Sequence, residues 1–339
     1  MRIFFEKVIV KLLQLKDLTE REAGRVFGDL FAQKLSHDQA KTLLLLLAAK
    51  GEAASEVVGC VKALRRLEPP MVSPVRGAMD TCGTGGDGSC SINVSTLSAL
   101  VIAGAGGYVA KHGNRALSSR SGSSDLLEAL GVRLDAGRRR MVRSLKMNGI
   151  GYFHAPLYHP VFSRMQALRR ELRVRTIFNL LGPLVNPVRI RYQLVGVSRP
   201  ENVALFAGVL SRAGMLRALV CHSEDGMDEI STASDTRAAV VEGTRVRYIR
   251  IRPRQLGFRQ AKKSDYAGGN VKKNRELALS ILRGRATGPG RDLVLMNSGA
   301  GLYVAGIAKN IKAGIELARR SLSEGRAYQA LCALRNETR

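Results

Sequence analysis

Tryptophan is absent from this sequence of 339 residues, and aromatic residues make up only 5% of it. So few rings leave little material for the stacking platforms that bind single-stranded nucleic acids. The five cysteines are odd in number and show no CxxC or Cys/His metal spacing, which predicts reduced thiols. The longest apolar run, at 43–49, is too short to cross a membrane, and charges interrupt the N-terminal segment too often for a signal peptide. We therefore expect a soluble, cytoplasmic protein.

Acidic residues are also scarce: 28 Asp and Glu stand against 54 Lys and Arg, a net charge of +26. Such an excess favours an anionic substrate or a nucleic-acid partner, or is typical of an arginine-rich proteome. The cations are spread over several segments, at 138–143, 164–175, 245–263 and 272–275. No helix-turn-helix, zinc-finger or RNP signature accompanies them. We expect nucleic acid to bind nonspecifically at most, at low salt.

Two sequence patterns follow one another along the chain. The first 70 residues read as helices, with capping boxes at Thr19–Glu22 and Ser36–Gln39, and end at Pro69-Pro70. From Asp80 onward, short apolar runs alternate with amphipathic segments, which is typical of parallel βαβ units. This predicts an α/β domain with a mostly parallel central sheet flanked by helices (75–157 and 186–339). A small all-helical domain precedes it (1–70, completed by about 158–185), since 158–175 also looks helical.

A glycine-rich loop, Gly83–Gly88, matches the pattern GxGxxG. A dinucleotide site would need an acidic residue at the end of the second strand, whereas the strand predicted at 108–111 ends in Lys111-His112. A P-loop would need Lys-Ser/Thr after the glycines, and it is missing. The remaining interpretation is an anion site built from backbone amides and a helix start.

Polar residues stand where that helix begins. Asn93, Ser95 and Thr96 can turn side chains and N–H groups toward an anion, although a plain strand–turn–helix capped by Ser95 remains the alternative. Asp87, inside the loop, is expected to accept hydrogen bonds from sugar hydroxyls or to orient the loop.

An acidic pair, Asp228-Glu229, follows a strand predicted at 218–221. Adjacent carboxylates suit Mg²⁺, which takes a few carboxylates together with waters and phosphate oxygens. The alternative is an exposed acidic turn.

Together, the motifs DTCGTGGD, INVST, KHGNR, SGSSDLLEALG, YHP, RTIFNLLGPLVNP, GMDEIS and NSGAGLYVAG resemble the anthranilate phosphoribosyltransferase family over nearly the whole chain. The resemblance implies the nucleoside phosphorylase/phosphoribosyltransferase-like fold. It also implies transfer of the phosphoribosyl group of 5-phosphoribosyl-1-pyrophosphate to the amine of anthranilate, with release of pyrophosphate, in tryptophan biosynthesis. The related nucleoside phosphorylases typically carry KHS where this chain has KHGNR.

The same resemblance implies site residues, Mg²⁺ as two ions, and a homodimer built through the small helical domain. The donor is implied to contact Gly83, Thr84, Gly85, Gly86, Asp87, Asn93, Ser95, Thr96, Lys111 and Ser123. The metal is implied at Ser95, Asp228 and Glu229, and anthranilate at Gly83, His112, Asn114, His159, Arg169 and Gly182. Lys111, Asn114 and Arg169 are the implied catalytic residues.

Arg169 fits its implied role, because a guanidinium donates two parallel hydrogen bonds to a carboxylate such as that of anthranilate. Two departures from the family pattern lie nearby: Arg173 replaces a glycine, and Val185 replaces a threonine. Both fall on the acceptor side. They leave open a paralogue with another aromatic acceptor, and the charge of +26 leaves open a nucleic-acid-binding relative without catalysis. His154 and His222 are expected to be ordinary structural histidines.

Overall fold

The structure is a computed structural model that describes residues 2–89, 91–116 and 121–339. The chain divides into two compact units, each made of two stretches of sequence. Unit 1 comprises Met1–Met71 and Pro156–Pro187, and unit 2 comprises Val72–Ala155 and Val188–Arg339.

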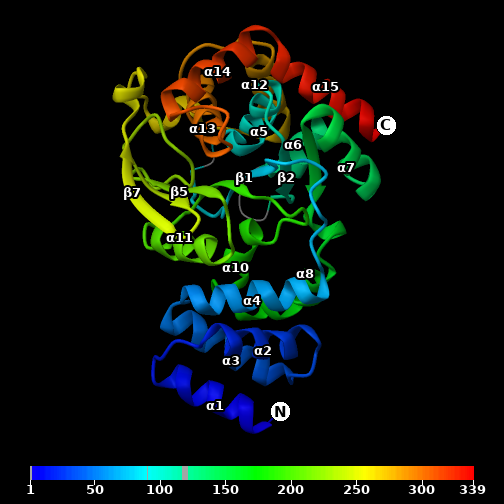
Figure 1. Ribbon diagram of the computed structural model, residues 1–339, viewed down its shortest axis with the longest axis vertical. Coiled ribbons are helices and arrows are strands. Elements are labelled where there is room, and N and C mark those ends of the chain that lie inside the picture. Colours follow the sequence, from blue (N-terminus) through cyan, green and yellow to red (C-terminus); the bar gives the residue numbers. More distant parts are fainter. Residues whose placement is uncertain (1, 90, 117–120) are drawn as a thin grey trace. The chain divides into compact units, whose positions relative to one another are not determined.

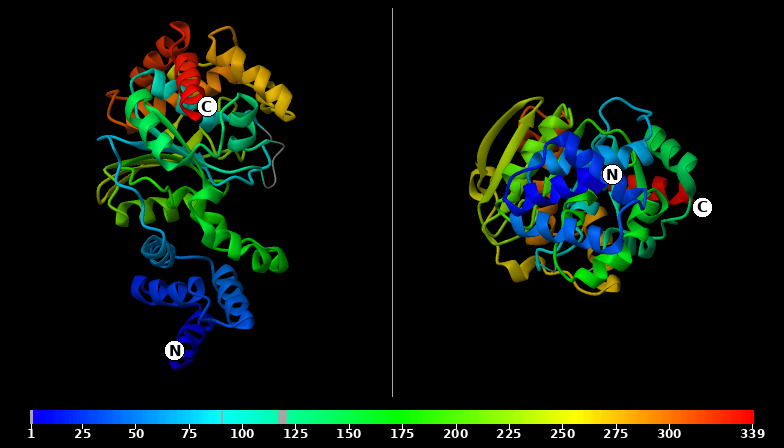
Figure 2. Two further views of the ribbon diagram at one scale, coloured as in Figure 1. Left: turned by 90° about the vertical axis from the view of Figure 1, so that its right-hand side faces the viewer. Right: turned by 90° about the horizontal axis from the view of Figure 1, so that it is seen from below.

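Unit 1 is helical. Its first stretch forms α1 (Arg2–Leu13), α2 (Glu20–Phe31), α3 (His37–Lys50) and α4 (Ala54–Leu67), which lie together in both views of Figure 2. The capping boxes at Thr19 and Ser36 are confirmed, since both side chains accept from the backbone N–H three residues on. A Cβ built on Gly59 would lie 2.6 Å from the Ala23 Cβ, so this glycine lets α4 approach α2 closely.

The second stretch of unit 1 is helical over 158–175, as expected, and its helices are short. It forms two short helices, α8 (Pro160–Arg164) and α9 (Gln166–Leu172), and then α10 (Phe178–Leu181) and the 3₁₀ turn η2 (Gly182–Leu184). Helix α9 ends because Arg173 takes the left-handed conformation, with φ of 52°.

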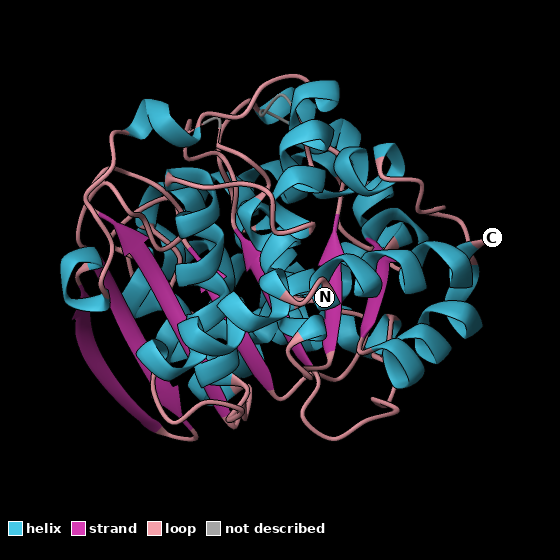
Figure 3. Ribbon diagram, turned by 90° about the horizontal axis from the view of Figure 1, so that it is seen from above, coloured by secondary structure: helices cyan, strands magenta, loops and turns pink. Residues whose placement is uncertain are grey.

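Unit 2 contains a seven-stranded sheet in the order β3-β2-β1-β4-β5-β6-β7, whose strands lie side by side in Figure 3. The strands are β1 (Met79–Gly83), β2 (Val109–Gly113), β3 (Ile150–His154), β4 (Tyr192–Gly196), β5 (Arg217–Ser223), β6 (Thr236–Glu242) and β7 (Arg245–Ile251). The first five in sequence are parallel, and β6 and β7 continue the sheet antiparallel. The expected mostly parallel α/β sheet is confirmed.

Helices cover both faces of this sheet. Figure 1 shows α5 (Val94–Gly104) and α13 (Pro289–Val304) above the strands and α11 (Asn202–Arg212) below them. The other helices of unit 2 are α6 (Ser123–Ala129), α7 (Gly137–Asn148), α12 (Val271–Leu282), α14 (Ile311–Ser323) and α15 (Arg326–Thr338). Two 3₁₀ turns, η3 (Pro253–Leu256) and η4 (Lys263–Tyr266), precede α12.

The strand order reverses between β1 and β4, because the chain moves outward to β2 and β3 and then returns to the other side of β1. In parallel α/β sheets ligands bind at the carboxyl ends of the strands beside such a reversal. A ligand site is therefore expected at this edge of the sheet. None of the helices described is long and apolar enough to span a membrane.

Candidate active site

The glycine loop leaves the end of β1 at this reversal, directly beside the end of β4. Thr84 donates its backbone N–H to the Gly196 carbonyl oxygen (2.9 Å), and the Ser198 N–H donates to the Thr84 hydroxyl (3.1 Å). Gly85, Gly86 and Gly88 all have positive φ, between 66° and 71°, so the loop needs residues without a Cβ. The sequence pattern therefore marks a real turn at the site.

Asp228 is packed into this turn. A Cβ on Gly83 would lie 2.3 Å from its carboxylate oxygen Oδ2, and one on Gly196 would lie 1.5 Å from its carbonyl oxygen. The N–H of Gly85 donates to the same Oδ2 at 2.7 Å. The loop after β1 and the acidic pair, 143 residues apart in sequence, thus form one site.

Asp228 and Glu229 are buried, each only 8% exposed, so the exposed acidic turn is excluded. Burial raises the pKa of Asp228, and the charge of Asp87 raises it further. Burial likewise raises the pKa of Glu229, with Asp228 adding to the effect and Lys111 opposing it. The buried pair Asp228-Glu229, with the charge of Asp87 acting on both, is an arrangement that a divalent cation would stabilise.

Asp87 orients the loop. Its Oδ1 accepts from the Ser89 N–H (3.1 Å) and its Oδ2 accepts from the Asp228 N–H (3.3 Å). The aspartate thus ties the glycine loop to the acidic pair.

The start of α5 lies next to these carboxyls. The backbone N–H of Ser95 lies close enough to the Glu229 carboxylate to lower its pKa, so the three residues expected at the metal lie together. Thr96 is 2% exposed, and its hydroxyl has no hydrogen-bond partner within the described part of the chain. Asn93 is the N-cap but is engaged elsewhere: its Nδ2 donates to the Ser121 carbonyl oxygen, and its Oδ1 accepts from Asn274. The alternative of a helix capped by Ser95 is wrong.

The end of β2 supplies the cation of the site. Lys111 is 3% exposed, and its ammonium donates to the His112 carbonyl oxygen at 3.2 Å. The His112 N–H donates to Asp80 in β1 (3.3 Å), which fixes the strand end, while Asn114 follows in an exposed turn. Ser123, at the start of α6, donates its hydroxyl to the Asn114 carbonyl oxygen at 3.2 Å.

The other expected acceptor residues belong to unit 1. His159 is buried, and its Nδ1 lies 2.8 Å from Glu68 Oε2. Burial lowers the pKa of Arg169; its guanidinium carbon lies 5.7 Å from the centre of the Phe178 ring, and among the described residues it has no acidic partner. Gly182 is exposed at the start of η2.

The donor set suits Mg²⁺. Asp228 and Glu229 supply buried oxygens whose ionised form costs free energy in the absence of a cation, and Ser95 adds a hydroxyl. No group of three or more His, Cys, Asp or Glu side chains arranged for a metal occurs among the residues that the structure describes. A Mg²⁺ ion held by this pair would need waters or substrate phosphates as its remaining ligands.

Sequence reasoning missed two residues that shape this site. Gly196 must be a glycine because the backbone of Asp228 lies against it. Asn297 in α13 braces the segment after Glu229, because its Oδ1 accepts from the Ile230 N–H (3.0 Å) and its Nδ2 donates to the Ile230 carbonyl oxygen (2.9 Å). The only signal for either was its place in a motif, LVGV or NSGAG.

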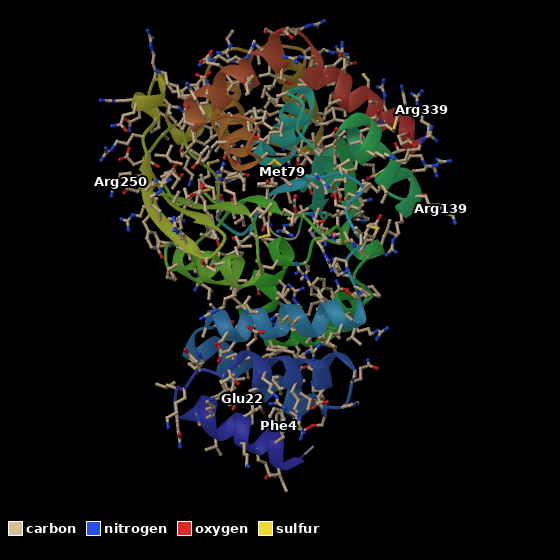
Figure 4. The ribbon with its side chains drawn as sticks, in the orientation of Figure 1. Phe4, Glu22, Met79, Arg139, Arg250 and Arg339 are labelled. Carbon is tan, nitrogen blue, oxygen red and sulfur yellow. The ribbon has the colours of Figure 1, made fainter. Side chains whose placement is uncertain are left out.

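The cations of segment 245–263 are exposed around β7, which is the edge strand of the sheet. This segment carries eight Lys and Arg residues and no Asp or Glu. Figure 4 places Met79 in the interior of unit 2 and Arg139, Arg250 and Arg339 at its periphery. Cys60, Cys82 and Cys221 are buried free thiols and Cys332 is free and half-buried, whereas Cys90 lies outside the described residues.

Comparison with known proteins agrees with this geometry. Residues 76–328 match the profile described as "Glycosyl transferase family, a/b domain", and residues 6–67 match "Glycosyl transferase family, helical bundle domain". The anthranilate phosphoribosyltransferase of Desulfosudis oleivorans is 41% identical over 327 residues, which is 96% of either chain.

Solved structures are similar as well. The crystal structure of anthranilate phosphoribosyltransferase from Thermus thermophilus superposes with a TM-score of 0.91 at 39% identity, covering 98% of this chain and 99% of that one. The Saccharomyces cerevisiae enzyme, solved in complex with PRPP and Mg, gives a TM-score of 0.88 at 24% identity, covering 100% of this chain and 98% of that one; at this identity it shows the fold alone. The chain belongs to the anthranilate phosphoribosyltransferase family and is a glycosyltransferase of the pentosyltransferase class.

Proposed function

We propose that this enzyme transfers the phosphoribosyl group of 5-phosphoribosyl-1-pyrophosphate to the amine of anthranilate, a step of tryptophan biosynthesis. The observation that carries the proposal is the packing of Asp228 against Gly83 and Gly85, with Glu229 on the N–H of Ser95. This packing joins a phosphate-type loop, a helix start and two buried carboxyls at the reversal of the sheet. A donor with two phosphate groups and a bound cation matches these parts.

On the donor side, the expected residues fall into two groups. The turn after β1 holds the ribose and pyrophosphate through Gly83, Thr84, Gly85, Gly86 and Asp87. Phosphate oxygens are held by Asn93, Ser95, Thr96, Lys111 and Ser123. The unpartnered hydroxyl of Thr96 and the α5 N-terminus support this assignment, because N–H groups at a helix start favour anions. Asn93 would act through its backbone, since its amide is bonded elsewhere.

Ser95, Asp228 and Glu229 would hold Mg²⁺, as two ions. When bound, magnesium supplies positive charge against the leaving pyrophosphate. Lys111 and the loop amides face the same leaving group, and such preorganised charge is commonly the largest catalytic effect. Asp87 and Asn297 keep the carboxyls in place through the backbone of Asp228 and Ile230.

On the acceptor side, Arg169 would bind the anthranilate carboxylate, with Gly83, His112, Asn114, His159 and Gly182 lining the remainder. Arg169 is half-buried and has no acidic partner in the described chain, so its charge is available to a ligand. The amine of anthranilate then attacks C1 of the ribose, and the C1–O bond to pyrophosphate breaks in an oxocarbenium-like transition state. The aromatic amine is a weak base and attacks in its neutral form, and the proton that it loses once the N–C1 bond has formed passes to solvent.

Fluorescence of anthranilate tests the proposal. Anthranilate should be consumed only when 5-phosphoribosyl-1-pyrophosphate and Mg²⁺ are both present, with one pyrophosphate released for each anthranilate lost. Turnover of another aromatic amine in preference to anthranilate would instead identify the paralogue that the substitutions at Arg173 and Val185 leave open.

Nucleic-acid binding without catalysis is the second candidate, and the exposed cations around β7 favour it. A gel shift with labelled RNA, run beside the fluorescence assay, separates the two. We expect a shift at low salt that disappears by about 0.2 M salt, as for nonspecific phosphate contacts, together with full enzyme activity. A salt-resistant shift from an inactive protein would overturn the enzyme assignment.

We further propose a homodimer formed through unit 1, in the cytoplasm, where charged phosphorylated sugars are retained. Helix α1 exposes Ile3, Val10 and Leu13, which are each more than half exposed, and Leu15 follows it. A helix face with so many exposed apolar side chains is typical of a protein interface. Sedimentation should give a dimer, and Val10→Glu with Leu13→Glu should give a monomer.

We propose that units 1 and 2 are the two domains of each subunit.

A further inference from the structure

Four polar side chains, two from β3 and two from the start of α6, form a hydrogen-bonded chain beside the end of β2. His154 Nδ1 lies 2.9 Å from Ser124 Oγ, which lies 2.6 Å from the Tyr152 hydroxyl oxygen. That hydroxyl lies 3.1 Å from Ser123 Oγ, whose own proton goes to the Asn114 carbonyl oxygen. Ser124 is 0% exposed and Tyr152 is 2% exposed, so water has no access to the middle of the chain.

The pairing of β2 with β3 builds this arrangement. Lys111 lies opposite Tyr152 and Gly113 lies opposite His154, and residues two apart in a strand point to the same face. Gly113 makes room for the chain, since a Cβ there would lie 2.1 Å from Ser123 Oγ and 2.9 Å from the Tyr152 oxygen. The hydrogen-bonded chain therefore lies beside the end of β2, close to Asn114.

The proton on His154 determines the direction of every hydrogen bond in this hydrogen-bonded chain, because each hydroxyl donates only once. Burial raises the pKa of Tyr152 to about 12, so its phenol keeps its proton. When His154 Nδ1 carries a proton, it donates to Ser124, Ser124 to Tyr152, and Tyr152 to Ser123. The proton of Ser123 then points outward, to Asn114 or to a phosphate oxygen.

The opposite arrangement arises when His154 Nδ1 carries no proton. Ser124 then donates to His154, and Tyr152 donates to Ser124. Ser123 must donate to Tyr152 if that contact is to keep a hydrogen bond, and its proton is withdrawn from the ligand side. Protonated imidazole permits only the outward arrangement, whereas neutral imidazole permits both through its two tautomers.

We propose that His154, acting through Ser124 and Tyr152, positions the Ser123 hydroxyl and thereby sets the affinity for the phosphoribosyl donor. The inference rests on the proposed function, in which Ser123 contacts a donor phosphate. His154, Ser124 and Tyr152 are positioning residues. Donor binding is strongest when His154 is protonated and weakens as the pH rises through the pKa of this histidine.

The groups around His154 place that change in pH. The imidazole is half-buried and is influenced by Arg115 after β2 and by Asp125 and Glu128 on α6. Burial lowers its pKa and the charge of Arg115 lowers it further, while Glu128 and Asp125 oppose the shift. The transition therefore lies on the acid side of about pH 6.5, the ordinary value for histidine.

Calorimetry with 5-phosphoribosyl-1-pyrophosphate and Mg²⁺ between pH 5 and 8 tests the inference. The donor's own ionisation affects every variant equally, so the readout is the difference in Kd from the wild type at each pH. Tyr152→Phe keeps the ring and the imidazole charge but removes the central hydroxyl. We expect it to bind donor about 5-fold more weakly at pH 5, and to lose the extra pH dependence of the wild type.

Two further variants complete the series. His154→Asn keeps a hydrogen-bonding group near the position of Nδ1 but does not titrate, so the extra pH dependence should vanish while donor still binds. Ser321→Ala is the control: it removes another fully buried hydroxyl of unit 2, which donates to the Val101 carbonyl oxygen at 2.9 Å, and should keep the wild-type profile.

If Tyr152→Phe keeps the wild-type pH dependence, the imidazole charge acts directly and the inference is overturned. The ¹⁵N signals of His154 give a readout that does not depend on donor. Ser124→Ala should shift the Nδ1 signal of His154, and identical spectra would contradict the hydrogen bond between His154 and Ser124. If the wild type binds no donor although Ser124→Ala shifts that signal, the proposed function fails and the hydrogen-bonded chain itself stands.

Discussion

The two units hold their expected site residues in different ways. In unit 2 the donor residues stand at the ends of β1 and β2 and at the start of α5, and backbone contacts such as that of Gly196 with Asp228 fix them. In unit 1 the acceptor residues stand on or beside α8, α9 and η2, elements of seven residues or fewer. Among the described residues, the half-buried Arg169 side chain has a ring contact with Phe178 and no ion pair.

This contrast predicts that unit 2 determines the reaction type and that unit 1 determines which acceptor is bound. Moving any part of the unit 2 site displaces several others, because each carboxyl is bonded to the backbone of another segment. Unit 1 should tolerate a change of one side chain at a time, because its expected acceptor residues stand on separate short elements. Substitutions in unit 2 should therefore reduce turnover, whereas those in unit 1 should change the KM for the acceptor or the stability.

The largest effect is expected at the acidic pair. Asp228→Ala with Glu229→Ala should lower kcat by about 10³-fold or more, since the charge that opposes the leaving pyrophosphate could no longer be held. Turnover at several Mg²⁺ concentrations measures it, with circular dichroism to show that the protein is folded. Undiminished activity would end the metal assignment.

The isosteric pair Asp228→Asn with Glu229→Gln should be as inactive, yet more stable without Mg²⁺. A carboxyl whose folded pKa is raised stabilises the fold fully below its unfolded pKa near 4 and loses that contribution as the pH rises through the folded value. At pH 8 the variant should exceed the wild type by at least about 1 kcal/mol in urea unfolding. Mg²⁺ should raise the Tm of the wild type alone.

Gly83→Ala should come next, with kcat lower by about 10²-fold. The new Cβ would lie 2.3 Å from Asp228 Oδ2 and would push the carboxylate out of its place, and misplacements near 1 Å cost about that much. Gly290→Ala is the matched control in unit 2, since its Cβ would meet Ile92 at an ordinary 3.7 Å. Equal activity of the two variants would show that Asp228 tolerates displacement.

Arg169→Ala should leave kcat and the donor KM nearly unchanged and raise the anthranilate KM about 10- to 100-fold, the usual cost of losing a charged hydrogen-bond pair. Arg170→Ala, at the exposed neighbouring position on α9, is the control and should behave as wild type. Equal increases in both KM values would remove Arg169 from the acceptor pocket.

The same contrast explains how much the sequence could predict. The capping boxes at Thr19 and Ser36 and the start of α5 depend on neighbours within a few residues, so the sequence shows them directly. The turn after β1 is visible in the sequence because its positive φ values require glycine. The sheet class followed from apolar periodicity. Gly196 and Asn297 could not be predicted, because the partners that require them lie 32 and 67 residues away in sequence.

The end of α9 in unit 1 is a feature that local sequence does not predict. The composition of 158–175 is helical throughout, and only the backbone shows that Arg173 ends α9 in a left-handed conformation. Nothing in its local chemistry announces the break, since arginine favours helices. Glycine is the residue that adopts this conformation without strain.

Arg173→Gly should therefore stabilise unit 1, by about 1 kcal/mol, because a residue with a Cβ pays about that much to adopt positive φ. Arg170→Gly makes the same exchange three residues earlier, inside α9, and should destabilise by a similar amount, since glycine is a poor helix former. Urea unfolding measures both. The donor Kd should not change in either variant, because neither position belongs to unit 2. Opposite signs from one substitution on one short helix would show that backbone conformation, and not the loss of a cation from a chain of net charge +26, sets the stability here; equal signs would contradict it.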